Sequence, residues 1–235
     1  MGASLPDGVG MSGIGCRRGW VRSQPSGQGQ ANVDKGVGTM GNGSERPLEG
    51  MRAAMAIGPM FEDVEATYPL YRLREAGAQV SILGLKANEE VVGKKGQGLR
   101  TDMAVADASP DSFDILVLPG GYGPDKLRTD AAVKRLVQEM NRRGKPIAFI
   151  CHAGWIPASA GILAGRRATS WPTIADDLVN AGAVWEDAEV VVDRNLVSSR
   201  RPDDLPAFMR ALIGVAAGPA SRLEPAAAAE SLTTA

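Results

Sequence analysis

Short apolar runs alternate with longer segments of helical period between residues 52 and 215, and this alternation restricts the fold more than any other feature. The run at 114–118 ends in Ile-Leu-Val-Leu, which is typical of a strand buried on both faces of a sheet. Residues 124–142, which follow it, carry apolar side chains at helical spacing. Strands that alternate with helices form a mostly parallel sheet covered by helices, so the sequence predicts an α/β fold.

The remaining elements complete this pattern. Strands are expected at residues 52–57, 79–83, 114–118, 146–150, 167–170, 189–192 and 196–199. Helices are expected at residues 62–75, 124–142, 155–163 and 203–215. A further helix is expected to pass through Leu178 and to end at Gly182. Pro69 predicts a kink or break in the first helix, and residues 91–104 with their three glycines predict a small hairpin or loop outside the core. The order is that of a single-domain, flavodoxin-like doubly wound sheet.

The two ends of the chain differ from this pattern. Residues 1–48 are rich in Gly, Ser, Gln and Asn and have no apolar period, so they are expected to form a disordered extension. Residues 218–235 are rich in alanine and contain two prolines, so they are expected to form a flexible tail. The folded domain is therefore expected at residues 51–217.

Charge and cysteine content exclude several classes of protein. The 26 Lys and Arg residues are balanced by 27 Asp and Glu residues, which argues against a nucleic-acid partner. The longest apolar runs are shorter than the roughly 18 residues that a membrane helix needs, so no membrane partner is expected. Cys16 and Cys151 lie in regions of different character, which argues against a disulfide framework and favours a cytoplasmic protein.

Cys151 ends an apolar run and begins a helical segment, a setting in which a nucleophile is exposed above a sheet. The positive end of a helix lowers the pKa of a thiol, so a thiolate is expected near neutral pH. His152 follows directly and is the one histidine of the chain. The alternative is that Cys151 is a small buried apolar residue beside an unrelated histidine, and position alone leaves both interpretations open.

Glycines and acids after two other strands could serve the same site. Gly120 and Gly121 follow a buried strand and could present backbone N–H groups as an oxyanion hole, or form a tight turn. Glu62 could direct its carboxyl group at Cys151, or simply interact with the dipole of the first helix. A histidine-based metal site is excluded because it needs two or three imidazoles, and no cofactor or metal is expected.

Five strings of residues carry a family resemblance. They are Phe61-Glu62-Asp63-Val64-Glu65 with Tyr68-Pro69, Leu118-Pro119-Gly120-Gly121 with Pro124-Asp125, Ile150-Cys151-His152, Asp176-Asp177-Leu178-Val179-Asn180-Ala181-Gly182, and Ser199-Arg200 with Pro202-Asp203-Asp204-Leu205. In order and spacing these strings resemble the PfpI-type branch of the ThiJ/PfpI superfamily, over residues 52–217. The resemblance implies a class I glutamine amidotransferase-like fold.

The resemblance also implies roles for individual residues. Cys151 would be the nucleophile, Glu62 would share a proton with it, and His152 would be its partner. Asp125 stands where the family places an acid that reaches this histidine from a neighbouring subunit. The resemblance therefore implies a homo-oligomer, either a dimer or a hexamer built of dimers.

Two further features of the site follow from the same resemblance. Gly120, Gly121 and the backbone amide of His152 would form the oxyanion hole. Trp171 stands where the family often has a tyrosine, and it would line the substrate pocket without offering a phenolic proton.

The resemblance implies a cysteine-dependent hydrolase, acting on peptides or proteins as an intracellular peptidase or on small carbonyl compounds as a glyoxalase or deglycase. The alternative is a stress-response redox sensor or chaperone-like protein in which Cys151 is oxidised. A glutaminase fits less well, because that activity usually uses a histidine far downstream of the cysteine and none follows His152.

Overall fold

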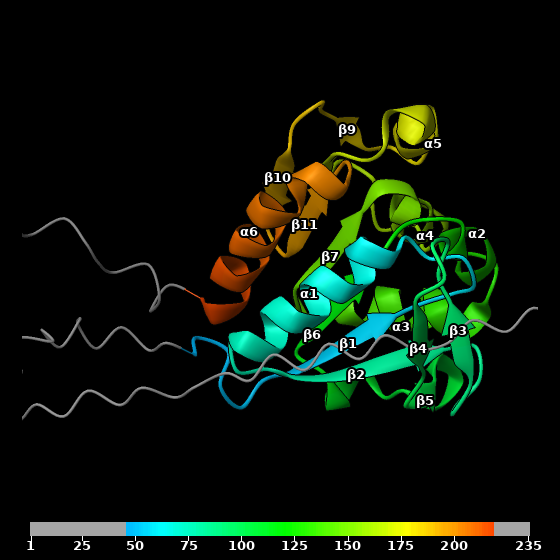
Figure 1. The fold of residues 1–235 in the computed structure, drawn as a ribbon. Helices are drawn as coiled ribbons and strands as arrows, with labels where there is room; N and C mark the ends of the chain where they lie inside the picture. The colour runs from blue at the N-terminus through cyan, green and yellow to red at the C-terminus, as the bar shows by residue number, and fades with distance from the viewer. Residues whose placement is uncertain (1–45, 219–235) are drawn as a thin grey trace, which may run out of the picture. The chain divides into compact units, whose positions relative to one another are not determined.

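The computed structural model describes residues 46–218. The expectations for the remainder of the predicted extension and tail, residues 1–45 and 219–235, lie outside the described residues. Within the described range, the centre of the fold is a seven-stranded sheet (Figure 1). In spatial order its strands are β10 (Val190–Asp193), β11 (Leu196–Ser199), β7 (Ile147–Ile150), β6 (Ile115–Leu118), β1 (Arg52–Ala56), β2 (Gln79–Gly84) and β5 (Met103–Ala104).

Neighbouring strands of this sheet are parallel, except that β10 pairs antiparallel with β11. The chain passes from β1 outwards through β2, returns to β6, and then continues through β7 to the other edge. This reversal of strand order between β1 and β6 makes the sheet doubly wound, as the sequence predicts. In such sheets, loops at the carboxyl ends of the central strands converge on one crevice.

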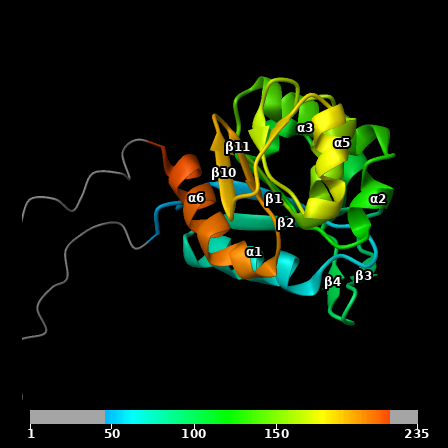
Figure 2. The ribbon, with the colours of Figure 1, turned by 90° about the horizontal axis from the view of Figure 1, so that it is seen from above.

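Helices cover both faces of the sheet. The six helices of the described residues are α1 (Asp63–Glu75), α2 (Gly123–Leu127), α3 (Ala131–Arg142), α4 (Trp155–Ser159), α5 (Ala175–Asn180) and α6 (Leu205–Ala217). Figure 2, seen from above, shows α1 beside α6 on one side of the sheet, with α3 and α5 on the other.

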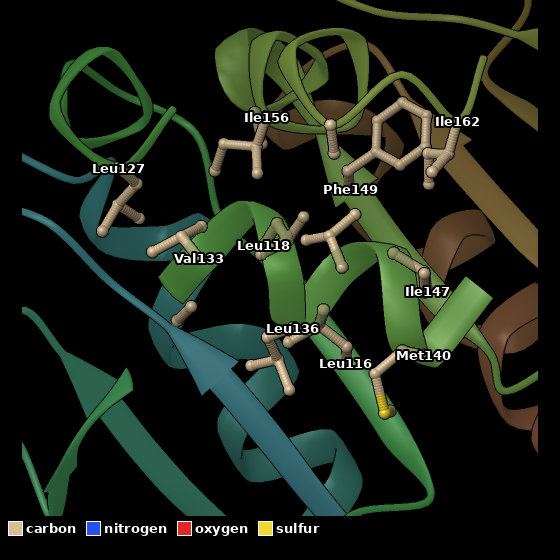
Figure 3. Packing of buried hydrophobic residues seen from close by; sticks show 14 of the residues in the cluster. Leu116, Leu118, Leu127, Val133, Leu136, Met140, Ile147, Phe149, Ile156 and Ile162 are labelled. Atoms are coloured by element: carbon tan, nitrogen blue, oxygen red, sulfur yellow. The ribbon is translucent and has the colours of Figure 1, made fainter. Parts of the chain in front are cut away.

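Side chains of a strand point alternately to the two faces, and this builds two hydrophobic layers. From β6, Ile115 and Val117 pack with α1 and α6. Leu116 and Leu118 pack into the opposite layer, with the apolar faces of α3 and α4 (Figure 3). All four side chains are fully buried. A strand buried on both faces has to be apolar throughout, which explains the sequence of this run.

The predicted helix at 124–142 is two helices, α2 and α3, separated at residues 128–130. The side chain of Asp130 accepts hydrogen bonds from the backbone N–H groups of Ala132 and Val133, at 2.8 and 3.0 Å. An aspartate in this position caps the amino end of a helix and favours a new start over continuation. In contrast, α1 continues through Pro69, so the break expected there does not occur.

The segment at 91–104 is divided between two structures. Residues of β3 (Glu90–Val92) and β4 (Gly98–Arg100) form the predicted hairpin, but β5 joins the edge of the main sheet beside β2. A second small parallel sheet pairs β8 (Arg167–Ala168) with β9 (Val184–Trp185), and β9 was not expected from the sequence. Five short 3-10 helices connect these elements: η1 (Val105–Asp107), η2 (Pro110–Ser112), η3 (Cys151–Gly154), η4 (Pro172–Ile174) and η5 (Pro202–Asp204).

The ordered fold begins a few residues earlier than the sequence predicts. Leu48, placed in the extension by its composition, is fully buried and packs into the layer of α1 and α6. Its backbone N–H donates to the carbonyl of Ala76 at 2.8 Å. Across residues 46–218, no helix combines the length and the apolar character needed to cross a bilayer.

Candidate active site

Three loops meet at the carboxyl ends of β1, β6 and β7. The loop after β1 is tied to the loop after β6 by two backbone bonds, from the Glu62 N–H to the Gly120 carbonyl at 3.0 Å and from the Tyr122 N–H to the Met60 carbonyl at 2.9 Å. Gly121 lies between them at a φ of +84°, and an added Cβ would stand 2.3 Å from the Glu62 nitrogen. Only glycine permits both this conformation and this close approach.

Cys151 is the first residue after β7 and the first of η3. Its φ of +61° lies in the left-handed region, which a residue with a Cβ rarely adopts. Such strain costs about 1–3 kcal/mol and is found where a side chain must be presented at a sharp turn. The residue is 7% exposed, and together with His152 it lines a pocket.

Glu65, rather than Glu62, is the acid beside Cys151. Its side chain is fully buried, and its Oε2 accepts a hydrogen bond of 2.9 Å from the Gly120 N–H. A Cβ on Gly120 would stand 2.5 Å from this oxygen and 2.7 Å from the Cys151 Cβ. The absence of a side chain at Gly120 therefore allows the carboxyl group and the cysteine to come together.

Glu62 has a different partner, which corrects the role that the family resemblance implies for it. Its Oε2 lies 3.4 Å from the Nζ of Lys94, in the turn between β3 and β4. Glu65 follows Glu62 by one turn of α1, and it belongs to the same buried stripe as Ala66 and Pro69. A charged residue within an apolar helical stripe was the signal in the sequence that could have identified Glu65.

Burial raises the pKa values of both Glu65 and Cys151. Burial, above all, raises the pKa of Glu65 from 4.5 to about 8. Burial and the neighbouring Glu65 raise the pKa of the Cys151 thiol to about 12, although the backbone N–H groups of His152 and Gly121 act in the opposite direction. The expectation of a lowered thiol pKa is therefore wrong, because burial, and after it the negative charge of Glu65, outweighs the backbone dipoles.

The amides that face the sulfur differ from those expected. The backbone N–H groups of Gly121 and His152 lie close enough to the cysteine sulfur to lower the pKa of its thiol. The Gly120 N–H is already bonded to Glu65, so it does not join them as the oxyanion donor that the resemblance implies. Two backbone donors therefore remain where negative charge can collect.

The imidazole of His152 lies against the sulfur, with Nδ1 3.2 Å from Sγ. Its ring stands edge-on to the Trp155 indole at 5.2 Å between centroids and is stacked with the Trp171 indole at 6.2 Å. Burial, and to a smaller extent the charge of Lys94, lowers the pKa of His152, so its ring is neutral near pH 7. Among residues 46–218, the structure gives no hydrogen-bond partner to Nε2 of this ring.

The pocket above the cysteine has a volume of about 340 Å³. It is lined by Glu62, Glu65, Lys94, Gly121, Tyr122, Cys151, His152, Trp171 and Pro202. Lys94, Tyr122 and Pro202 were not expected from the sequence, because they come from the hairpin turn and from loops whose positions depend on distant contacts.

Asp125 does not belong to this pocket within one chain. It lies on α2 with its side chain 57% exposed, and its carboxylate is 3.6 Å from the Nζ of the adjacent Lys126. Across residues 46–218, no three His, Cys, Asp or Glu side chains gather in an arrangement suited to a metal ion.

Comparison with known proteins yields one family. The model of the DJ-1/PfpI family matches residues 51–214. A deglycase of Pyrococcus abyssi is 47% identical over 163 residues, which are 69% of this chain and 98% of the relative. The deglycase PfpI of Pyrococcus furiosus is 46% identical over 153 residues, 65% of this chain and 92% of the relative. YraA of Bacillus subtilis, named as a candidate cysteine protease, is 40% identical over 159 residues, 68% of this chain and 94% of the relative.

Solved structures agree with this result. Drosophila melanogaster DJ-1beta is 31% identical, with a TM-score of 0.68, over 73% of this chain and 92% of that one. A two-domain protein of Anabaena variabilis, with DJ-1/ThiJ/PfpI-like and ferritin-like domains, is 37% identical with a TM-score of 0.68. That match covers 69% of this chain and 47% of the other, so this chain spans about half of the two-domain protein.

Proposed function

The chain belongs to the DJ-1/PfpI family, and on this premise we propose that it is a cysteine-dependent hydrolase of small dicarbonyl compounds and their glycation adducts. The thiolate of Cys151 would attack the carbonyl carbon. The observation that carries the proposal is the placement of this sulfur between the Glu65 carboxyl group, two backbone N–H groups and the imidazole of His152. The names of the archaeal relatives, which are deglycases, agree with this chemistry.

Glu65 explains how a buried thiol can react. Its pKa of about 8 leaves the carboxyl group mostly protonated at pH 7, so it adds no negative charge beside the sulfur. Loss of one proton from the pair can then leave a thiolate that accepts a hydrogen bond from the Glu65 carboxyl group. Because the two groups interact strongly, this first proton belongs to the pair and not to either residue.

The proposed reaction begins when Sγ forms a bond to the aldehyde carbon of a 2-oxoaldehyde. The electrons of the C=O double bond move to oxygen, where the N–H groups of Gly121 and His152 stabilise the charge, and a proton completes a hemithioacetal. Neutral His152 takes the proton from the former aldehyde carbon and returns it to the adjacent carbon, while the hydroxyl proton of the hemithioacetal passes to the former ketone oxygen, and a 2-hydroxy thioester results. Water hydrolyses the thioester, releasing a 2-hydroxy acid and the free cysteine, for a net addition of one water.

Completion of the site by a second subunit is part of the proposal. An imidazole that moves protons needs an orienting acceptor, and Nε2 of His152 has none among the described residues. Asp125, exposed on α2, is available to supply a carboxylate to the His152 of a neighbouring copy. The active form is then a homo-oligomer, a dimer or a hexamer of dimers.

Peptide hydrolysis is the second candidate, favoured by the name of YraA. It would use the same thiolate, but the acyl-enzyme would form by expulsion of an amine. A pocket of about 340 Å³ suits a compound with few non-hydrogen atoms better than an extended peptide. We therefore place small carbonyl compounds first.

Kinetics on four proteins tests the proposal. Wild type should consume methylglyoxal and form lactate, Cys151→Ala should lose this activity, and Asp125→Asn should assemble like wild type while turning over at least tenfold more slowly. A fluorogenic peptide assayed in parallel separates the two candidates. Lys134→Met, a charge change on α3 away from the pocket, is the control and should match wild type. Unaltered methylglyoxal turnover by Cys151→Ala would refute the covalent mechanism.

A further inference from the structure

Lys94 brings a positive charge to the pocket that holds Cys151, and the reaction proposed above makes no use of it. The other ionisable residues that line the pocket are Glu62, Glu65, Tyr122, His152 and Cys151 itself. Among these lining residues, Lys94 alone is a cation near neutral pH, since the imidazole is neutral there. A cation in a pocket otherwise formed by neutral and acidic groups calls for a ligand that it would bind.

The position of Lys94 is determined by the backbone of the hairpin and not by its side chain. Asp63, buried at the start of α1, accepts hydrogen bonds from the N–H groups of Lys95 and Gln97, at 2.7 and 2.8 Å. The Lys94 N–H itself donates to the carbonyl of Phe61 at 2.8 Å. These bonds join the tip of the hairpin to the loop that follows β1. They fix the backbone of Lys94 at the edge of the pocket, and so they fix where its side chain starts.

The ammonium group of Lys94 makes two weak contacts. It is 3.4 Å from the Glu62 carboxylate, and it stands 5.7 Å from the centre of the Tyr122 ring. The Lys94 side chain is 41% exposed, so solvent weakens this ion pair. With three N–H donors, the ammonium group can bind a second acceptor, or exchange Glu62 for one, at little cost.

We propose that Lys94 determines substrate specificity, by binding a phosphate or carboxylate group of a 2-oxoaldehyde whose aldehyde carbon lies at Cys151. The inference rests on the proposed function and adds a substrate class to it, the anionic dicarbonyl compounds. Glu62 competes with the substrate for Lys94 and so sets how strongly the pocket prefers an anion. Lys94 therefore increases the preference for an anionic substrate, and Glu62 decreases it.

A matched pair of substrates isolates this charge. Hydroxypyruvaldehyde and its phosphate ester differ in the anionic group alone, and consumption of either can be followed by dicarbonyl derivatisation. We expect wild type to have a kcat/KM about tenfold higher for the phosphate, the effect of one charge-assisted hydrogen bond. Lys94→Met should abolish the preference by raising KM for the phosphate, whereas Lys94→Arg should keep it.

Lys95→Met is the control, because it removes the same charge from the next residue of the turn, whose side chain does not line the pocket. It should retain the preference of wild type. Glu62→Gln should increase the preference, through a lower KM for the phosphate. Equal preference in Lys94→Met and Lys95→Met, or a decrease in Glu62→Gln, would overturn the assignment.

A binding measurement separates this inference from the catalytic proposal. In Cys151→Ala, which cannot form a covalent adduct, hydroxypyruvaldehyde phosphate should change the fluorescence of Trp171 at the pocket, with an affinity that Lys94→Met lowers about tenfold. If wild type consumes neither compound but this difference in affinity is found, the catalytic proposal fails and the anion site stands. If wild type consumes both compounds but the affinities are equal, the anion site fails and the catalytic proposal stands.

Discussion

Replacement of Glu65 by glutamine should change how the stability of the fold depends on pH. The pKa of Glu65 is raised from 4.5 to about 8, so below pH 4.5 the folded and unfolded chains both hold its proton. As the pH rises from 4.5 to 8, the folded chain keeps a proton that the unfolded chain has lost, and stability decreases. At 1.36 kcal/mol per pKa unit the full loss is about 5 kcal/mol, of which about 3 kcal/mol is already lost at pH 7.

Glutamine has nearly the same shape, can accept the Gly120 N–H, and has no proton to lose in this range. We therefore expect the difference in the free energy of unfolding between Glu65→Gln and wild type to shift by about 4 kcal/mol in favour of the variant between pH 5 and pH 9. Urea unfolding at constant ionic strength measures this difference. Cys151→Ala keeps the burial that raises the pKa of Glu65 and removes the Cys151 hydrogen bond that lowers it, so its stability should decrease with pH at least as much as that of wild type. A constant difference between Glu65→Gln and wild type across this range would show that Glu65 is not a carboxyl group titrating in a buried site.

Two other substitutions test the glycine contact and the helix start. Gly120→Ala places a Cβ 2.5 Å from Glu65 Oε2 and 2.7 Å from the Cys151 Cβ, and we expect kcat/KM for methylglyoxal to fall about 10- to 100-fold. Gly144→Ala, at a φ of +66° with open space around it, should cost about 1 kcal/mol of stability and leave kcat/KM unchanged, which makes it the control. Asp130→Ala should lower the free energy of unfolding by about 1 kcal/mol through loss of the α3 cap, as measured by urea titration.

Much of the architecture follows from local patterns. The alternation of apolar runs with helical segments predicts the doubly wound sheet, and the all-apolar run of β6 predicts a strand buried on both faces. The strand ends also indicate which residues can meet, because parallel strands bring their carboxyl ends to one edge. This places Cys151, Gly121 and the start of α1 in one region without knowledge of a single distance.

Patterns read over many residues give the wrong prediction where a single residue determines the local structure. Asp130 is an ordinary helix cap, yet the helical period on both sides of it predicts one continuous helix. Leu48 stands alone in a polar, glycine-rich stretch, so composition assigns it to the extension although its side chain fills the core. In both cases the structure depends on one side chain, whereas the prediction depends on the pattern of the residues around it.

The sequence alone determined the fold class and the place of Cys151 and His152 at the end of a buried strand, since these depend on periodicity and on adjacent residues. Only the tertiary structure decided that Glu65 and not Glu62 faces the sulfur, because Glu62 is the N-cap residue of α1, Glu65 lies in its first turn, and the rotation of that helix against the sheet selects between them. Only the tertiary structure brought Lys94 to the pocket, because Asp63 holds the hairpin through bonds that span more than 30 residues of chain. Side-chain identity limits what chemistry is available, and packing between distant segments decides which groups share a site.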